Sequence, residues 1–236
     1  MPEAARGAER RRLEAEIAEL KAHAGEPGAS AEGPAAAAPA DATLRSLPAD
    51  PAAAARGKAA FASCAGCHGA EAEGRVGIAP RLNSATFLAA ASDRFLVDTI
   101  THGRAGTTMI GWGQSLGAPA IQDIVVYLRS LSPVPPATLD ESPLAGDAEK
   151  GAATFGSICA TCHGRHGGGY QETGNGTGIG RRAFLASATN GFLRHLVRHG
   201  KSDTPMRPFT GARTSVANLD PAEIDNVIAY MRASAW

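Results

Sequence analysis

Aromatic side chains are scarce in this chain of 236 residues, where Phe, Trp and Tyr together make up 5%. A small domain with so few rings has little apolar bulk of its own, so we expect a bound apolar group to supply part of the core. The sequence also lacks strands alternating with helices, which argues against a βαβ fold. These absences favour a protein that folds around something it binds.

The formal net charge of the chain is zero, since 23 Lys and Arg residues balance 23 Asp and Glu residues. By segment the sums are −3 for residues 1–50, +2 for 51–132, −2 for 133–146 and +3 for 147–236. No segment has the strong positive field that nucleic acids attract, so we expect no nucleic-acid partner. A modest basic face is still able to steer an acidic protein partner.

The sequence contains no long apolar run, and every apolar stretch falls well short of the ~20 residues that a membrane span needs. Arg10-Arg11-Arg12 precedes a mixed segment of Leu, Glu, Ala and Ile rather than the apolar core of a signal peptide. We therefore expect no transmembrane segment in this chain, and we find no visible signal peptide.

Cysteine occurs only four times, and all four residues belong to two C-x-x-C-H motifs: Cys64, Cys67 and His68, then Cys159, Cys162 and His163. Two thiols at this spacing form thioethers to the vinyl groups of one haem, and the adjoining His reaches the iron. Half a zinc site and a redox-active dithiol are the alternatives. Two copies in matching surroundings favour two covalently bound haem c groups.

The surroundings of the motifs repeat as well. Four pairs of residues are separated by the same 97 positions, whereas the motifs are separated by 95: Phe87 and Phe184, Phe95 and Phe192, His102 and His199, Met109 and Met206. One haem-binding unit used twice explains this pattern. We divide the chain into an N-terminal helix with an Ala/Pro-rich tether (1–50), a first repeat (51–132), a linker (133–146) and a second repeat (147–236).

Helical patterns mark the elements of each repeat. In the first repeat we expect helices from Pro51, over 87–91, over 93–101 after the cap Ser92, and from Pro119. In the second repeat we expect helices after Asp147, from Phe184, after Thr189 or Asn190, and after Asp220. Residues 9–22 have a narrow apolar stripe, which fits either a solvated tail or a docking helix, and residues 24–55 have the composition of a linker.

Each haem iron needs a second axial ligand whose position repeats. Met109 and Met206 lie in corresponding loops, each two residues after a Thr, whereas Met231 belongs to an apolar helix face. His102 and His199 also repeat, but each lies at a helix end, where it can bond the last carbonyl groups. We therefore predict ligation by His68 and Met109 in one repeat and by His163 and Met206 in the other.

Gly57, Phe61, the first motif, Met109 and Tyr127 resemble a class I cytochrome c. Gly151, Phe155, the second motif, Met206 and Tyr230 do so as well. The pair is similar to a dihaem cytochrome of the c4 type, or to the dihaem c subunit of a respiratory complex. The resemblance implies an all-α fold with two tandem class I cytochrome c domains, each a small helical shell around one haem c.

The resemblance further implies that the first and last helices of each domain cross at the Gly, and that a Pro carbonyl, here of Pro80, bonds the iron-binding His68. The second repeat has Gly178-Ile179-Gly180-Arg181 in the equivalent stretch, without a proline. Either another carbonyl orients His163 or that site is looser, so we expect unequal haem potentials.

The resemblance favours an electron-transfer protein rather than an enzyme, because two six-coordinate haems leave no iron position open to a substrate. Its expected partners are subunits of a membrane respiratory or photosynthetic complex and a soluble redox carrier, on the periplasmic side of the cytoplasmic membrane. Attachment of haem c outside that membrane requires a signal that has been removed or lies upstream of Met1, or another export route. A dihaem redox enzyme of the peroxidase or thiosulfate-oxidising type, and a subunit with structural haems, are the alternatives.

Overall fold

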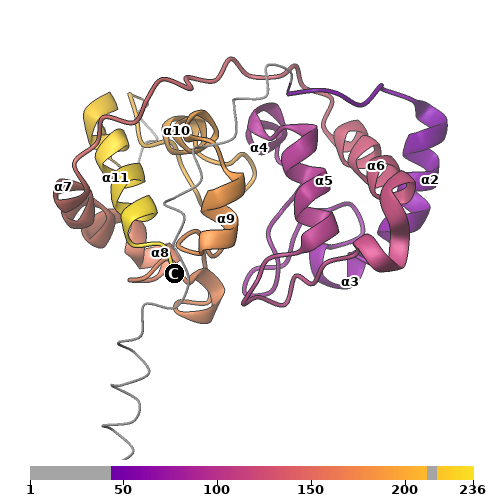
Figure 1. Cartoon of the computed structure of the whole chain (residues 1–236), viewed down its shortest axis with the longest axis horizontal. Helices are drawn as coiled ribbons and strands as arrows, with labels where there is room; N and C mark the ends of the chain where they lie inside the picture. The colour runs from indigo at the N-terminus through magenta and orange to yellow at the C-terminus, as the bar shows by residue number, and fades with distance from the viewer. Residues whose placement is uncertain (1–43, 212–216) are drawn as a thin grey trace, which may run out of the picture. The chain divides into compact units, whose positions relative to one another are not determined.

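A computed structural model describes residues 44–211 and 217–236 of the chain (Figure 1). The part described is helical, and its only strand-like pairing is an isolated bridge between Arg75 and Ala79. The expected all-α class is confirmed. The helix predicted over residues 9–22 and most of the tether lie outside the described residues.

Both repeats have helices in the same order. The first repeat holds α2 (Pro51–Phe61), α3 (Ala65–His68), α4 (Ala85–Ala90), α5 (Asp93–His102) and α6 (Gly113–Leu131). The second holds α7 (Ala148–Thr154), the π-helix η1 (Phe155–Cys159), α8 (Ala160–His163), the 3₁₀-helix η2 (Gly169–Gln171), α9 (Arg182–Ser187), α10 (Asn190–His199) and α11 (Pro221–Ala233).

The helix starts follow the local sequence. Ser92 and Thr189 accept hydrogen bonds from the backbone N–H groups of Phe95 and Phe192, so Thr189 is the cap of α10. Asp220 forms a reciprocal capping box with Glu223 at the start of α11. Helix α6 starts earlier than expected, at Gly113, and breaks at Gly117, whose φ is 73°. Pro119 opens the segment after that break.

The first and last helices of each repeat cross at a glycine. A Cβ at Gly57 in α2 would lie 1.9 Å from the carbonyl oxygen of Asp123 in α6, and one at Gly151 in α7 would lie 1.9 Å from that of Asn226 in α11. Only glycine permits such an approach of two backbones. Beside each crossing two rings pack together, Phe61 on Tyr127 at 5.4 Å between centroids and Phe155 on Tyr230 at 5.2 Å.

The π-helix η1 explains an irregularity in the repeat. Phe61 lies three residues before Cys64, whereas Phe155 lies four residues before Cys159. The second repeat accommodates its extra residue by widening one turn over Phe155–Cys159. The Phe therefore stays on its Tyr, and the Cys still begins the short helix that carries the His.

Residues 44–47 pack against the first repeat, although the sequence composition predicted a linker there. Arg45 donates hydrogen bonds to the carbonyl oxygens of Leu88 and Ala91, at 2.9 and 3.3 Å. The N–H groups of Ser46 and Leu47 both donate to Asp93 Oδ2, at 2.7 and 2.9 Å. The start of the first repeat therefore extends back to at least residue 44.

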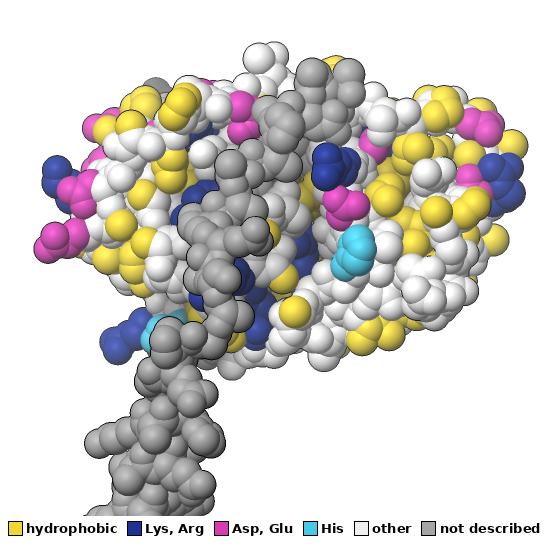
Figure 2. Space-filling model, viewed as in Figure 1, with side chains coloured by type: hydrophobic (Ala, Val, Ile, Leu, Met, Phe, Trp, Pro, Cys, Tyr) yellow, Lys and Arg dark blue, Asp and Glu magenta, His cyan; other side chains and the backbone are white. Residues whose placement is uncertain are grey.

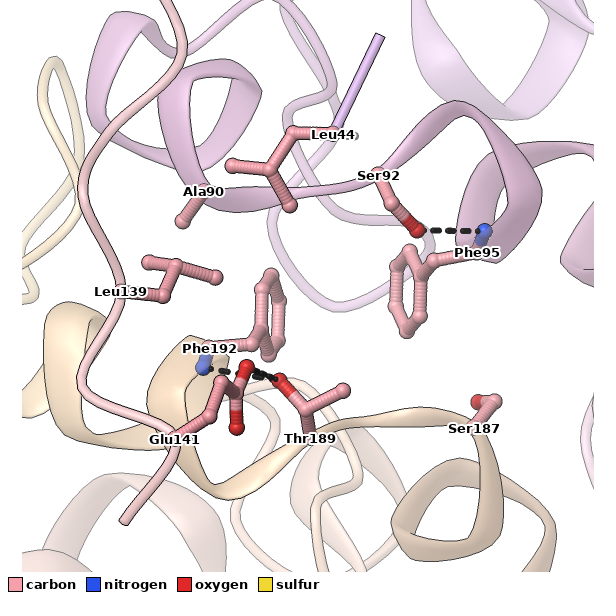
Figure 3. Close-up of a pocket in the computed structure, with 9 residues that line it drawn as sticks. All are labelled: Leu44, Ala90, Ser92, Phe95, Leu139, Glu141, Ser187, Thr189 and Phe192. Carbon is pink, nitrogen blue, oxygen red and sulfur yellow. Dashed lines mark hydrogen bonds between the residues drawn. The ribbon is translucent and has the colours of Figure 1, made fainter. Parts of the chain in front are cut away.

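A seam of four phenylalanine rings joins the two repeats. Phe192 packs on Phe95 at 5.0 Å and on Phe87 at 6.1 Å between centroids, and Phe184 packs on Phe95 at 6.5 Å. Figure 3 shows Phe95 and Phe192 side by side, with Leu44, Ala90 and Leu139 around them. The linker holds the seam at one edge, where Glu141 bonds the N–H of Gly191 and the hydroxyl of Thr189.

The second repeat has an arginine–asparagine hydrogen bond where the first repeat has a buried arginine–aspartate ion pair. Arg129 donates to Asp93 Oδ1 at 2.8 Å, whereas Arg232 donates to Asn190 Oδ1 at 2.8 Å. Both arginines also donate to two carbonyl groups in and just after the last turn of the preceding short helix.

Asn at position 93 would keep an acceptor for Arg129 but would turn a donating amide toward the N–H groups of Ser46 and Leu47, so Asp93→Asn should cost about 3 kcal/mol or more of unfolding free energy. Urea denaturation checks this, and a loss below about 1 kcal/mol would contradict it.

Candidate functional site

Each C-x-x-C-H motif lies on a short helix with its first Cys at the N-cap. Cys64 precedes α3 and Cys159 precedes α8, and each helix ends on the motif His. All four thiols are free of disulfides, with Cys67 and Cys162 exposed and Cys64 and Cys159 partly buried. One helical turn therefore presents two thiols and an imidazole together, as covalent haem attachment requires.

The Nδ1 atom of each histidine is fixed by a backbone carbonyl. His68 Nδ1 donates to the Pro80 carbonyl at 3.0 Å, and His163 Nδ1 donates to the Thr177 carbonyl at 2.8 Å. This bond leaves Nε2 unprotonated and available to an iron. Burial lowers the pKa of both imidazoles, although the carbonyl acts in the opposite direction. Burial is the larger effect, so the net shift favours the neutral, ligating form.

Thr177 settles which group orients His163. From the resemblance, residues 178–181 correspond to the stretch that contains Pro80, and they include no proline. The sequence therefore leaves open whether another carbonyl replaces that of Pro80. The 97-residue offset places Thr177 opposite Pro80, and its carbonyl serves the same role. The bond needs only a carbonyl, so the proline is dispensable. Applying the offset to Pro80 would have found Thr177 from the sequence.

The glycine-rich loop of the second repeat packs onto its own motif. Gly176 donates its N–H to the Cys162 carbonyl at 2.8 Å, and the Thr173 hydroxyl donates to the same oxygen at 2.6 Å. A Cβ at Gly176 would lie 2.8 Å from His163 Nδ1. Glycine is thus needed for close approach, and this loop packs directly against the second motif.

Met109 and Met206 lie in identical turns after α5 and α10. In the first turn, the N–H of Met109 donates to Thr107 Oγ1 at 3.1 Å, and its carbonyl accepts from the N–H of Arg104 at 2.8 Å. In the second, Met206 donates to Thr204 Oγ1 at 3.2 Å and accepts from Lys201 at 2.8 Å. The repeated Thr therefore closes the turn that fixes the backbone of each methionine.

His102 and His199 are placed differently from each other. His102 Nδ1 bonds the carbonyl of Asp98 in its own helix at 3.0 Å, which is the role expected for a residue at a helix end. The ring of His199 instead lies 4.5 Å from that of His195, one turn earlier in α10. Both residues are exposed.

The thiols do not suit the two alternatives to haem. Burial raises the pKa of Cys64, and it raises the pKa of Cys159 to about 11. Dithiol redox pairs and zinc sites depend on accessible thiolates with a lowered pKa. In residues 44–211 and 217–236, no three His, Cys, Asp or Glu side chains gather as metal ligands. The donor set of paired thiols beside an oriented imidazole fits haem c.

The chain has two tandem domains, and in each the first and last helices cross with a C-x-x-C-H helix between them. This arrangement defines the protein as a cytochrome c with two repeats. The family model described as cytochrome c oxidase, cbb3-type, subunit III, matches residues 52–128 and 146–231. The chain belongs to this family. The match covers both repeats and supports haem c as the cofactor.

Curated relatives agree with this assignment. The cbb3-type cytochrome c oxidase subunit FixP of Azorhizobium caulinodans is 40% identical over 129 residues, which are 51% of this chain and 42% of the relative. The subunit CcoP of Rubrivivax gelatinosus is 32% identical over 184 residues, 77% of this chain and 55% of the relative. The chain thus spans about half the length of these relatives.

Among solved structures, a chain of the Kuenenia stuttgartiensis reducing HAO-like protein complex is similar at 18% identity and a TM-score of 0.49. The match covers 77% of this chain and 96% of that one. Within the described residues, no helix is both long enough and apolar enough to cross a membrane.

Proposed function

We propose that the chain carries two haem c groups and passes single electrons within, or to and from, a cbb3-type oxidase complex. When bound, haem supplies an iron that takes up and releases one electron. Cys64, Cys67, Cys159 and Cys162 would hold the porphyrins covalently. His68 with Met109, and His163 with Met206, would be the axial ligands.

The observation that carries this proposal is the duplicated arrangement of ligand candidates. Both repeats present an imidazole whose Nδ1 is bonded to a carbonyl, and both hold a Met in the same Thr-closed turn. Thioether ligation favours ferrous iron and raises the reduction potential. Filling both axial positions leaves no site for a substrate, which supports electron transfer over catalysis by this chain.

The partners and location follow from the family. Relatives named as cbb3-type oxidase subunits support a membrane complex as one partner. We propose a soluble redox carrier as the other. We place both repeats on the periplasmic side of the cytoplasmic membrane, associated with it through the partner subunits. Figure 2 shows separate Lys and Arg side chains on this face with Asp and Glu side chains among them, and the positively charged ones would guide the docking of an acidic carrier.

Replacement of each methionine by leucine tests the ligation. Met109→Leu and Met206→Leu should each lower the potential of one haem and let the reduced protein bind carbon monoxide at that haem, because a coordination position opens. Met231→Leu is the matched control, since Met231 is buried in α11 and outside both turns. Redox titration and carbon monoxide difference spectra provide the readouts.

Two results would contradict the proposal. Rapid, complete binding of carbon monoxide at one haem of the unmodified protein would instead favour a dihaem enzyme. A haem content other than about two per chain, measured on the purified protein, would refute the duplicated cofactor site.

A further inference from the structure

Two histidines lie one turn apart on helix α10. His195 and His199 are separated by four positions, so their side chains extend over the same face of the helix. Their ring centroids are 4.5 Å apart, and the ring planes are inclined by 48°. His199 is exposed and His195 is half-buried, so an ion can reach the pair from solution.

The pair is not part of the duplicated haem-binding unit. The residues 97 positions earlier are Asp98 and His102. The Asp98 carboxylate lies 3.5 Å from Arg94 Nε, and its backbone carbonyl accepts a hydrogen bond from His102 Nδ1 at 3.0 Å. Within the described residues, by contrast, neither His195 nor His199 takes part in a hydrogen bond or an ion pair. The first repeat therefore holds its site without a second imidazole here.

The separation of the two rings suits a single metal ion held between them. With a metal–nitrogen bond of about 2.0 Å and a ring centre about 1.1 Å beyond the nitrogen, two imidazoles bound at right angles have centres about 4.4 Å apart. A tetrahedral angle would place these centres about 5.1 Å apart. The observed 4.5 Å is closer to the right-angled value. Right-angled coordination by nitrogen is typical of Cu²⁺ and Ni²⁺, and Cu²⁺ binds such ligands most tightly.

The charges around the pair allow a cation to bind there. Burial lowers the pKa of His195, and the positive charges of His199 and Arg198 act in the same direction. A neutral imidazole has a lone pair to offer a metal. Arg198 itself lies 3.5 Å from the carboxylate of Asp140, which reduces its repulsion of an added cation.

Helix α10 holds the two histidines in a fixed register. The buried Arg194, next to His195, donates to both carboxylate oxygens of Asp225 in α11 at 2.7 and 2.8 Å. Phe192, one turn before His195, packs in the seam between the repeats. Because the helix is anchored on both sides, little backbone freedom would be lost when an ion binds.

We propose that His195 and His199 together bind one Cu²⁺ ion, with water completing its coordination. Zn²⁺ and Ni²⁺ bind at the same place more weakly. This site goes beyond the proposed function, because it uses none of the haem-binding residues and is confined to the second repeat.

Titration of the haem-loaded full chain with Cu²⁺ tests the site. The haems are kept ferric, so that the added ion has no electron to accept. Isothermal titration calorimetry should give a tightest site of one ion per chain, and electron paramagnetic resonance should show splitting by two imidazole nitrogens. His195→Ala and His199→Ala should each weaken that site at least about tenfold, because the second imidazole binds at a high effective concentration.

Two histidines outside the pair provide matched controls. His102→Ala removes the imidazole at the position equivalent to His199, and His166→Ala removes one that lies 3.7 Å from the carboxylate of Glu172. Neither change should alter the affinity of the tightest site. The haem absorption spectrum should also stay the same when Cu²⁺ is added, because the ion binds away from both irons.

Unchanged affinity in both His195→Ala and His199→Ala, or splitting by one nitrogen alone, overturns the proposal. An equal loss in His102→Ala or His166→Ala assigns the binding to scattered surface histidines and overturns it as well. Far-UV circular dichroism checks that the helices persist in each variant. Where His195→Ala disturbs α10, the exposed His199 decides the outcome through His199→Ala alone.

Discussion

Serine at both Cys159 and Cys162 should remove about half of the covalently bound haem and leave the second repeat unfolded, while the first repeat keeps its own haem. The physical reason is the thin core. The buried rings of the second repeat are Phe155 and Phe192, and the latter belongs to the seam. Without a porphyrin, the remaining aliphatic side chains bury too little apolar surface to offset the loss of chain entropy.

Two measurements follow this change. Haem staining after denaturing electrophoresis reports covalent attachment, and far-UV circular dichroism reports the helices of the second repeat. Thr161→Gly is the matched control, because it changes an exposed residue between the same two cysteines and recreates the Gly66 of the first motif. Undiminished covalent haem in the double serine variant would falsify the attachment site.

The sequence predicts most helices of this fold because their signals are local. Ser92, Thr189 and Asp220 cap helices through bonds to residues three positions away, and such bonds depend on few other parts of the chain. The motif helices are equally local. The candidate ligands are predicted on a different basis. Because the sequence is duplicated, it shows which methionines occupy corresponding positions in the two repeats.

Other features depend on contacts between distant residues, which composition does not encode. Residues 44–47 have the composition of a linker, yet Arg45 and Asp93 bind that segment to the first repeat. The π-turn at Phe155–Cys159 forms because a ring must stay on Tyr230 and a Cys must begin α8. Likewise, Lys201 is an ordinary loop lysine in the sequence, and only the packing of Phe87 beneath it reveals its position at the seam.

Alanine at Gly151 should destabilise the second repeat by about 3 kcal/mol or more, even though alanine is the better helix former. Its Cβ would lie 1.9 Å from the carbonyl oxygen of Asn226 and 2.9 Å from Cβ of Tyr230. Both obstacles are close to the backbone of α11, so no side-chain rotation relieves the overlap. The two helices would have to move apart, and Phe155 would then lose its contact with Tyr230.

Gly156→Ala provides a matched control five residues further along the same segment. A Cβ at Gly156 would meet nothing within 4 Å, so this change should leave the unfolding free energy within about 1 kcal/mol of its original value. Urea denaturation of the haem-loaded chain, followed by circular dichroism and by haem absorption, measures both. Similar midpoints for the two variants would show that α7 and α11 tolerate separation. A selective loss for Gly151→Ala would mean that the spacing of these helices holds the second haem site together.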